Sequence, residues 1–377
     1  MRILLLLVAL LASCGPLQAR ATTLQPLPRI RHVFLILLEN KGFDETFGAG
    51  SPAIFLSQDL PQRGQLLTQY YATGHVSLDN YVSLVSGQAP NSDTQSDCQI
   101  YSDFVGAPSL DADGQAVGQG CVYPAFVPTI ADQLDAKLAA RPLRWKGYME
   151  DMGNSSTEPA TCRHPPLNSR DDTQSARVGD QYAARHNPFV YFHSIIDSPR
   201  CDANVVPLTE LDTDLQRVST TPNYAFITPN LCNDGHDAPC VDGQPGGLVS
   251  ADAFLQQWVP KILASHAFRR DGLLIVAFDE AEVSGSNMDS SACCNEPTGP
   301  NTASPGITGP GGGRTGAVLV SKFIRPGSVN DTPYNHYSLL RSVEDLFAVE
   351  HLGYAGQAGL AAFGSDVYNC YPRSLCR

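Results

Sequence analysis

Polar side chains follow three apolar runs of the sequence, each at the point where the run ends. The runs and the residues after them are Val33 to Leu38 with Glu39 and Asn40, Tyr224 to Ile227 with Asp234 and His236, and Leu273 to Phe278 with Asp279 and Glu280. Carboxylates, amide oxygens and an imidazole are ligands of hard or borderline divalent cations, whereas clustered carboxylates without a cation repel each other. One acid after a strand is usually a solvated turn, but three such ends together favour a shared metal site.

Ser77 is the candidate nucleophile of the sequence. It follows Thr73 to Val76 and precedes a helical pattern with apolar residues on one face, so we expect it at a helix N-terminus. The commonest role of a serine there is that of an N-cap. As a nucleophile it would attack phosphorus, because backbone amides and the helix dipole favour an anionic substrate and a metal lowers the pKa of the hydroxyl. Both roles remain open from the sequence.

The elements that must position these residues alternate between strand and helix. We expect buried strands at Val33 to Leu38, Gln65 to Tyr71, Tyr224 to Ile227, Leu273 to Phe278 and Ala317 to Val320. Helical apolar faces run from Phe254 to Leu263 and from Leu339 to Phe347. This alternation predicts an α/β fold whose mostly parallel central sheet is flanked by helices on both faces. Ligands of such sheets bind beyond the carboxyl ends of the strands, where the acids lie.

The composition indicates a globular protein with a strong negative charge. The chain has 377 residues, of which 42% are hydrophobic and 17% charged, and its net charge is −13. No internal repeat or long linker divides it, so we expect residues 22–377 to form a single domain. The charge argues against nucleic acid or an anionic membrane as a partner, since phosphates would be repelled. It is compatible with a carboxylate-rich site that holds cations.

Residues 1–21 have the pattern of a signal peptide, with an early Arg, an apolar run of about ten residues and then small residues. Two cleavage sites compete. Leu11 to Cys14 fits a bacterial lipoprotein box, which would place a lipid anchor on Cys14, while Ala19 to Ala21 fits an ordinary signal-peptidase site. No later segment has the roughly 20 apolar residues of a transmembrane helix. We expect an exported bacterial protein that is periplasmic, secreted or held at the outer membrane by lipid.

Export changes what the cysteines indicate. Ten cysteines remain besides Cys14, an even number suited to disulfides in an oxidising compartment. Zinc–thiolate sites are the alternative, but no CxxC pair has the right partner spacing, and adjacent cysteines chelate poorly. Loop length favours the bonds Cys232–Cys240 and Cys370–Cys376.

Seven motifs occur in order along the chain. They are EN-x-x-FD (Glu39 to Asp44), H-x-S-x-x-NY-x-x-L-x-SG (His75 to Gly87), RHNPF (Arg185 to Phe189), ITPNLCNDGHD (Ile227 to Asp237), FDE (Phe278 to Glu280), GPGGGRTG (Gly309 to Gly316) and YNHYSLLRSVEDLF (Tyr334 to Phe347). Each alone is weak, but the ordered set resembles the phosphoesterase family that includes bacterial acid phosphatases and non-haemolytic phospholipases C. The resemblance spans roughly residues 30 to 355 and implies an alkaline-phosphatase-like fold.

The resemblance also implies roles for the residues. Ser77 would be the nucleophile that forms a phosphoserine, and Asn80 would contact the phosphate. Glu39, Asp279, Glu280 and Asp234 would bind one or two divalent metal ions, and Asn40 would hold either metal or a phosphate oxygen. The candidates for a second metal, a phosphate contact or the leaving-group acid are His186, His236 and His336. Two-zinc relatives would carry an Asp-His pair where this chain has Asp279-Glu280, so the number and identity of metals stay open.

Three functions remain to be separated. The sequence favours an exported, metal-dependent phosphomonoesterase of the acid phosphatase type. A phosphodiesterase or phospholipase C shares the machinery but needs room for a second ester substituent. Several such phospholipases carry extra C-terminal domains, which we do not expect here from the length of the chain. The alternative outside catalysis is an exported binding protein with an inactive site, against which the intact Ser77, Glu39 and Asp279 count.

Overall fold

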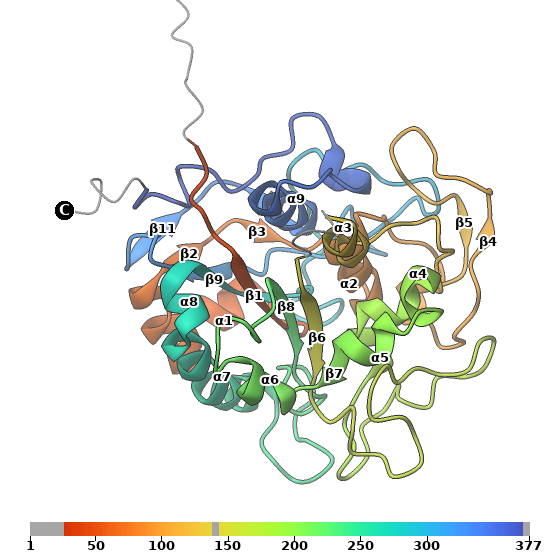
Figure 1. Cartoon of the computed structure of the whole chain (residues 1–377), viewed down its shortest axis with the longest axis horizontal. Coiled ribbons are helices and arrows are strands. Elements are labelled where there is room, and N and C mark those ends of the chain that lie inside the picture. Colours follow the sequence, from red (N-terminus) through yellow and green to blue (C-terminus); the bar gives the residue numbers. More distant parts are fainter. Residues whose placement is uncertain (1–25, 138–142, 372–377) are drawn as a thin grey trace, which may run out of the picture.

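A computed structural model describes residues 26–137 and 143–371, which are built around an eight-stranded sheet (Figure 1). The strands lie in the order β11-β2-β10-β9-β1-β8-β6-β7. Their bounds are β1 His32–Leu38, β2 Gln65–Leu67, β6 Trp145–Met149, β7 Val205–Pro207, β8 Tyr224–Thr228, β9 Gly272–Phe278, β10 Ala317–Ser321 and β11 Ser328–Asn330. The predicted leader, including Cys14, lies outside the described residues.

The sheet is mostly parallel, which confirms the predicted α/β class. Strand β1 pairs in parallel with β8 on one side and with β9 on the other. The pairs β6–β8, β6–β7 and β2–β11 are also parallel. Only β10 runs against its neighbours β2 and β9. The carboxyl ends of β1, β8 and β9 therefore meet at one edge of the sheet, as the site requires.

Helices cover both faces of the sheet, as predicted (Figure 1). Their bounds are α1 Phe43–Phe47, α2 Ser77–Ser86, α3 Ile130–Ala136, α4 His193–Ile196, α5 Arg200–Asn204, α6 Glu210–Asp214, α7 Gly247–Ala264, α8 His266–Asp271 and α9 His336–Phe347. Alternate residues of β1 enter two separate cores, because successive side chains of a strand point to opposite faces. Val33, Leu35 and Leu37 pack with α2 and α9, whereas Phe34, Ile36 and Leu38 pack with α7.

The strands differ from the prediction in two ways. The predicted strand Gln65 to Tyr71 is divided into β2 and a second strand β3 (Tyr70–Tyr71), which pairs with β12 (Tyr334–Asn335) instead of with the main sheet. Strand β6 was not predicted. It contains Lys146, whose ammonium pairs with Glu210 and Asp214 at 3.0 and 2.8 Å, so its sequence is not a continuous apolar run.

Disulfides join four cysteine pairs of the described chain. The predicted bond Cys232–Cys240 is confirmed, and the others are Cys98–Cys121, Cys162–Cys201 and Cys293–Cys294. The predicted bond Cys370–Cys376 involves Cys376, which lies outside the described residues. Disulfides persist in oxidising compartments, so these bonds are compatible with the expected export.

We expect a disulfide that closes a longer loop to stabilise the fold more, by an amount that grows with the logarithm of the loop length. The sequence separation is 39 for Cys162–Cys201 and 8 for Cys232–Cys240. Loop-closure entropy then predicts losses of about 4 and about 2.5 kcal/mol when each pair is replaced by alanines. Urea unfolding of the two double variants measures both losses. Equal losses, or a larger loss for the short loop, would contradict the entropic account.

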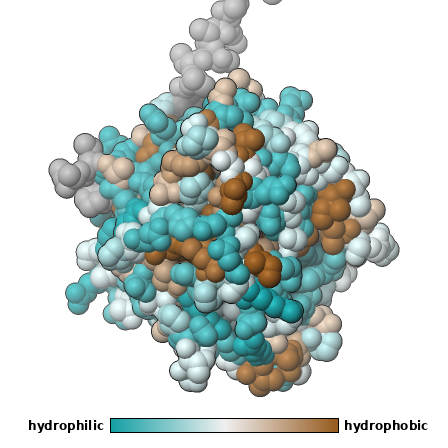
Figure 2. Space-filling model, turned by 90° about the vertical axis from the view of Figure 1, so that its right-hand side faces the viewer, coloured by the Kyte–Doolittle hydropathy of each residue, from teal (hydrophilic) through white to brown (hydrophobic). Residues whose placement is uncertain are grey.

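Apolar side chains are scattered over the surface of the described chain. Figure 2 shows separate apolar patches among hydrophilic residues on one face of the molecule. The most exposed large apolar side chains come from distant parts of the sequence, such as Val105 at 76%, Val178 at 74% and Val329 at 66%. Within the described residues, no helix has both the length and the apolar character needed to cross a bilayer.

Candidate active site

Ser77 and Glu39 form the central contact of the site. Ser77 is the first residue of α2, and its hydroxyl donates a hydrogen bond of 2.7 Å to Glu39 Oε2. The phenol of Tyr81, one helical turn later, donates to Glu39 Oε1. The N-cap of α2 is Val76, and the Ser77 hydroxyl is directed to the carboxylate. The N-cap role that the sequence left open for Ser77 is therefore wrong.

The register of two neighbouring strands places Glu39 and Asp279 side by side. Leu38 is the partner of Phe278 in the parallel pair β1–β9, so the next residue of each strand lies at the same edge. Asp279 Oδ1 accepts the backbone N–H groups of Asn40 at 2.9 Å and of Glu280 at 2.6 Å. These bonds fix the carboxylate of Asp279 at the end of β9.

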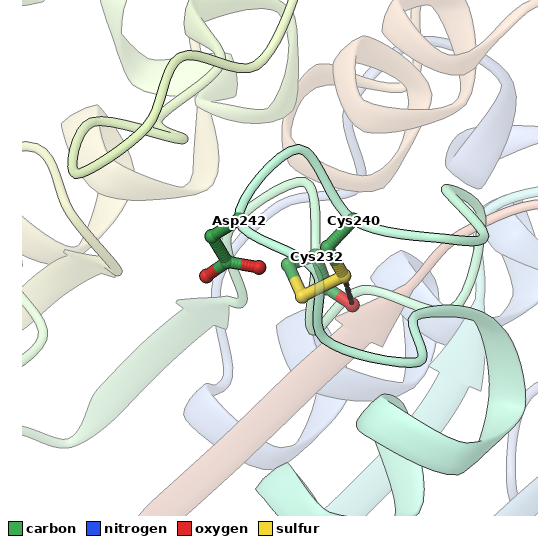
Figure 3. A group of neighbouring side chains, drawn as sticks. All are labelled: Cys232, Cys240 and Asp242. Atoms are coloured by element: carbon green, nitrogen blue, oxygen red, sulfur yellow. Dashed lines mark hydrogen bonds between the residues drawn. A yellow bond between two sulfur atoms is a disulfide. The ribbon is translucent and has the colours of Figure 1, made fainter.

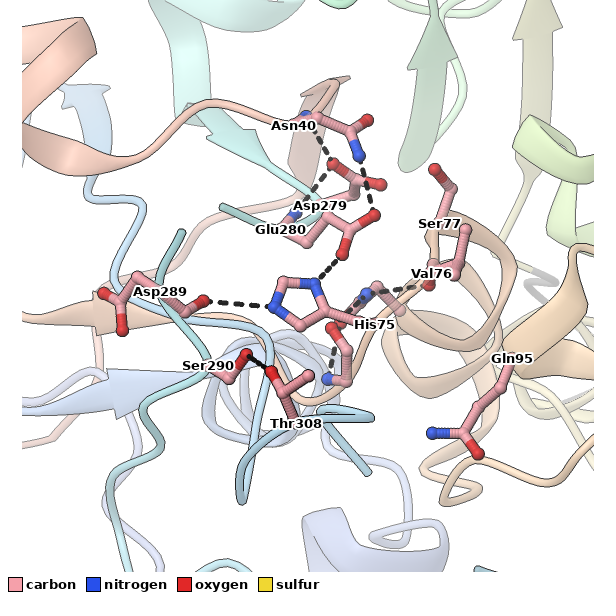
Figure 4. Close-up of polar contacts among 12 residues, drawn as sticks. Asn40, His75, Val76, Ser77, Gln95, Asp279, Glu280, Asp289, Ser290 and Thr308 are labelled. Atoms are coloured by element: carbon pink, nitrogen blue, oxygen red, sulfur yellow. Dashed lines mark hydrogen bonds and ion pairs between the residues drawn. The ribbon is translucent and has the colours of Figure 1, made fainter. Parts of the chain in front are cut away.

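Asn40 presents an amide oxygen to the site. Its φ of 51° lies in the left-handed region, which asparagine tolerates better than most residues. Its Nδ2 donates to Glu280 Oε1 at 2.7 Å. The other end of the amide, Oδ1, is buried without a hydrogen-bond partner, as is Asp279 Oδ2. Figure 4 shows Asn40 beside the carboxylates of Asp279 and Glu280, with Ser77 on the neighbouring segment.

Glu280 has protein partners at both carboxylate oxygens. Oε1 accepts from Asn40, and Oε2 contacts Nδ1 of His75, whose ring is fully buried (Figure 4). The sequence suggested Glu280 as a direct metal ligand. In this structure its two oxygens hold Asn40 and His75, and its role as a metal ligand stays a prediction.

His186 lies beside Glu39, on a short helical turn before Pro188. Its Nε2 is 3.3 Å from Glu39 Oε2, and its Nδ1 is 3.7 Å from Asp234 Oδ2. The ring stacks on Tyr81 with centroids 5.3 Å apart and an interplanar angle of 5°. Burial, helped by the charge of Arg185, lowers the pKa of His186 well below its usual value. The ring is therefore neutral, and both of its nitrogens lack hydrogen-bond partners.

The other predicted site residues lie at different depths. The side chain of His236 is 46% exposed. A charge on His236 contributes to lowering the pKa of His186, so His236 lies near the outer end of the site. His336 is buried and held by Tyr70 OH at 2.8 Å and the carbonyl of Asp279 at 2.5 Å. Burial lowers its pKa to about 4. It therefore supports the end of β9 as a neutral group.

Asn80 has a structural set of contacts. Its Oδ1 accepts the backbone N–H groups of Thr73 and Gly74, both at 3.0 Å, and its Nδ2 donates to the carbonyls of Gly74 and Val76. Both ends of the amide are therefore committed to the loop before Ser77. Asn80 therefore has no free polar atom for the predicted contact with phosphate, and we assign the residue to shaping that loop.

Burial raises the pKa values of the acids at the site. Burial raises the pKa of Asp279 to about 6 and that of Asp234 to about 8. It also raises the pKa of Glu39 well above its usual range, and the charges of Asp279 and Asp234 add to the effect. Without a cation, these carboxylates can lose all their protons only at a large cost in free energy.

The donor set suits a hard divalent cation. Two fully buried carboxylates, Glu39 and Asp279, and the unpartnered Asn40 Oδ1 supply oxygen ligands beside the Ser77 hydroxyl. Among the described residues, no three ligand atoms of the four predicted acids, Glu39, Asp234, Asp279 and Glu280, lie within 4.8 Å of one another. One group of three His, Cys or acid residues in the described chain has ligand atoms within 4.8 Å of one another. It consists of Cys232, Cys240 and Asp242 (Figure 3). The first two are joined as a disulfide, so they are not thiolate ligands.

We expect the metal-free protein to lose a stabilising contribution from Asp234 as pH rises from about 4 to about 8. The folded-state pKa of this residue, about 8, exceeds the value of about 3.9 for an unfolded Asp. Its contribution is complete below the unfolded pKa and is lost as pH rises through the folded pKa. Melting temperatures of chelator-treated wild type and Asp234→Asn measure it. The wild type should fall more steeply with pH, and parallel curves would contradict the prediction.

Several residues of the site carried no separate signal in the sequence. Tyr81 lies within the NY part of a motif, but its hydrogen bond to Glu39 needs α2 to be packed against β1. Arg185 pairs with Asp97 at 3.3 Å, and Asp97 Oδ1 accepts the N–H of Leu78 near the start of α2. Asp97 lies in a loop that no motif covers, so only the fold brings it to the helix.

Comparison with known proteins assigns the chain to a family. The model of the Phosphoesterase family matches residues 51–350, and the chain belongs to this family. The resemblance seen in the sequence is thereby confirmed.

Similar curated proteins include phosphatases from fungi and bacteria. The probable acid phosphatase of Kluyveromyces lactis is 26% identical over 329 residues, which cover 86% of this chain and 59% of that protein. The phosphate-repressible acid phosphatase of Penicillium chrysogenum is 26% identical over 294 residues, covering 78% and 54%. The phosphatidylinositol-3-phosphatase of Mycobacterium tuberculosis is 23% identical over 332 residues, covering 88% and 82%. The chain thus spans somewhat more than half the length of the two fungal relatives.

Among solved structures, a protein of the alkaline phosphatase superfamily from Vibrio parahaemolyticus is similar, with a TM-score of 0.46 and 15% identity. The likeness covers 85% of this chain and 67% of that chain.

Proposed function

We propose that the protein is an exported, metal-dependent phosphomonoesterase that acts through a phosphoserine at Ser77. The observation that supports this most is the Ser77 hydroxyl, hydrogen-bonded at 2.7 Å to a buried carboxylate at the end of a central strand. Family membership and the similarity to proteins named acid phosphatases agree with a phosphate ester substrate.

The first half of the reaction transfers the phosphoryl group to Ser77. Ser77 Oγ forms a bond to phosphorus while the bond from phosphorus to the alcohol oxygen breaks. Glu39 Oε2 already accepts the Ser77 hydroxyl hydrogen and takes that proton, for which its raised pKa suits it. His236, near the outer end of the site, is the candidate to give a proton to the departing alcohol.

The second half releases phosphate. Water attacks the phosphorus of phosphoserine, and the Oγ–P bond breaks. His186 is neutral and has free nitrogens, so it can accept a proton from that water, while the proton on Glu39 returns to Ser77 Oγ. A divalent cation on Glu39, Asp279 and Asn40 Oδ1 would neutralise phosphate charge and lower the pKa of the serine hydroxyl.

Paired turnover assays test the proposed function. Aryl phosphate monoester should be hydrolysed faster than the matched bis-aryl diester, and chelation of divalent cations should abolish both activities. Faster diester turnover would favour a phosphodiesterase or phospholipase C instead. Tight binding of inorganic phosphate with no turnover in any divalent cation would favour the exported binding protein.

Replacing Tyr81 by Phe should change the pH profile of the reaction. The Tyr81 phenol donates to Glu39 and lowers the pKa of that carboxyl, partly against the effect of burial. Without it the pKa of Glu39 rises, so the base stays protonated to a higher pH. The acid limb of kcat/KM for an aryl phosphate should therefore shift to higher pH. An unchanged limb, or a shift to lower pH, would contradict the role of Glu39 as base.

A further inference from the structure

His75 joins the wall of the candidate active site to the long segment between β9 and β10. Its ring is fully buried two residues before Ser77. Nδ1 contacts Glu280 Oε2, and Nε2 is 3.1 Å from the carbonyl oxygen of Asp289 (Figure 4). A carbonyl oxygen only accepts, so Nε2 carries a hydrogen. A second hydrogen must lie between Nδ1 and Glu280 Oε2, because two acceptors would otherwise face each other.

Glu280, which His75 holds in place, in turn fixes the orientation of the Asn40 amide. Its Oε1 accepts the Asn40 amide hydrogen at 2.7 Å, while its Oε2 is held by His75. If the Asn40 amide were reversed, two acceptor oxygens would face each other inside the protein, at a cost typical of an unsatisfied buried polar group. The carboxylate therefore selects which end of the amide faces Glu280. The end left over is Oδ1, which is buried without a hydrogen-bond partner.

We propose that His75 is a positioning residue that fixes Glu280 and, through it, directs Asn40 Oδ1 toward the cation and phosphate beside Ser77. The proposal rests on the proposed function. It also explains why the histidine and the serine of the H-x-S motif are neighbours. One segment then carries both the nucleophile, Ser77, and the residue that holds Glu280, His75. Neither Glu280 nor His75 touches the substrate in this account.

Two matched substitutions separate the contacts of His75. In His75→Asn, the amide nitrogen takes the place of Nδ1 and can donate to Glu280, but the contact with Asp289 is lost. In His75→Gln, the amide nitrogen reaches the place of Nε2 and the contact with Glu280 is lost. Loss of a partner behind a metal ligand costs about 10–100-fold in metal affinity or activity. His75→Asn should therefore retain at least about tenfold higher Mn²⁺ affinity than His75→Gln.

The primary readout is the dissociation constant for Mn²⁺, measured by calorimetry on chelator-treated protein, with kcat and KM for an aryl phosphate as the second. Equal affinities, or a tighter His75→Gln, would overturn the proposal. If either variant fails to fold, Glu280→Gln and Glu280→Leu give the same comparison, because glutamine can still accept from Asn40 and donate to His75. Equal Mn²⁺ affinity of these two would then overturn it. If the wild type shows no phosphatase turnover but the Mn²⁺ affinities of the variants still differ as predicted, the proposed function is wrong and the role of His75 is retained.

Discussion

Ser77→Gly should remove almost all turnover while the protein stays folded. The substitution deletes the hydroxyl that donates to Glu39 and, at the first position of α2, costs at most about 1 kcal/mol of stability. Loss of a nucleophilic serine lowers kcat by on the order of 10⁴–10⁶. Steady-state kinetics with an aryl phosphate, together with circular dichroism, measure the two effects separately.

Ser86→Ala is the matched control for this experiment. Ser86 is a buried serine at the other end of α2, and its hydroxyl donates to the carbonyl of Val82 at 2.7 Å. Its removal should lower stability slightly and leave kcat within about threefold of wild type. A Ser77→Gly enzyme that works at a rate near that of Ser86→Ala would rule out the serine as nucleophile.

Asp279→Asn should empty the metal site as well as stop turnover. The substitution keeps the size of the side chain but removes one of the two buried anionic donors beside Ser77. Losing a residue that only hydrogen-bonds to a metal ligand already lowers metal affinity by about 10–100-fold, so loss of a direct anionic ligand should exceed that. Elemental analysis after dialysis should find metal in the wild type and none in the variant.

A buried acid elsewhere controls for general damage to the fold. Asp252 in α7 accepts the N–H groups of Phe55 and Leu56, none of which belongs to the proposed metal site. Asp252→Asn should lower stability and retain the metal. A full metal content in Asp279→Asn, or equal loss in both variants, would contradict the proposed donor set.

The sequence predicted the parts of the fold whose signals are local. Strands β1, β8 and β9 are continuous apolar runs buried on both faces, and such runs can be recognised without knowing the neighbours. Because those strands are parallel, the acids after them had to meet at one edge. That is why Glu39 and Asp279, separated along the chain by most of its length, could be paired from the sequence.

The partners of individual polar atoms could not be predicted in the same way. Glu280 turns away from Asp279 because His75 and Asn40 hold its two oxygens, and His75 is itself fixed by a carbonyl in the segment between β9 and β10. The Asn80 amide is likewise taken up by its own loop. Such choices depend on loop conformations, for which the sequence has no periodic signal.

Trapping the covalent intermediate tests the central claim most directly. The enzyme would be mixed with a ³²P-labelled aryl phosphate and quenched during turnover, one half in acid and the other in denaturant at mildly alkaline pH, because phosphohistidine hydrolyses in acid. After digestion, the labelled peptide would be sequenced by mass spectrometry. The account predicts phosphoserine at Ser77, formed in the wild type and absent in Ser77→Gly. A label on another residue such as His186, or phosphate release with no label on Ser77 at any quench time, would contradict it.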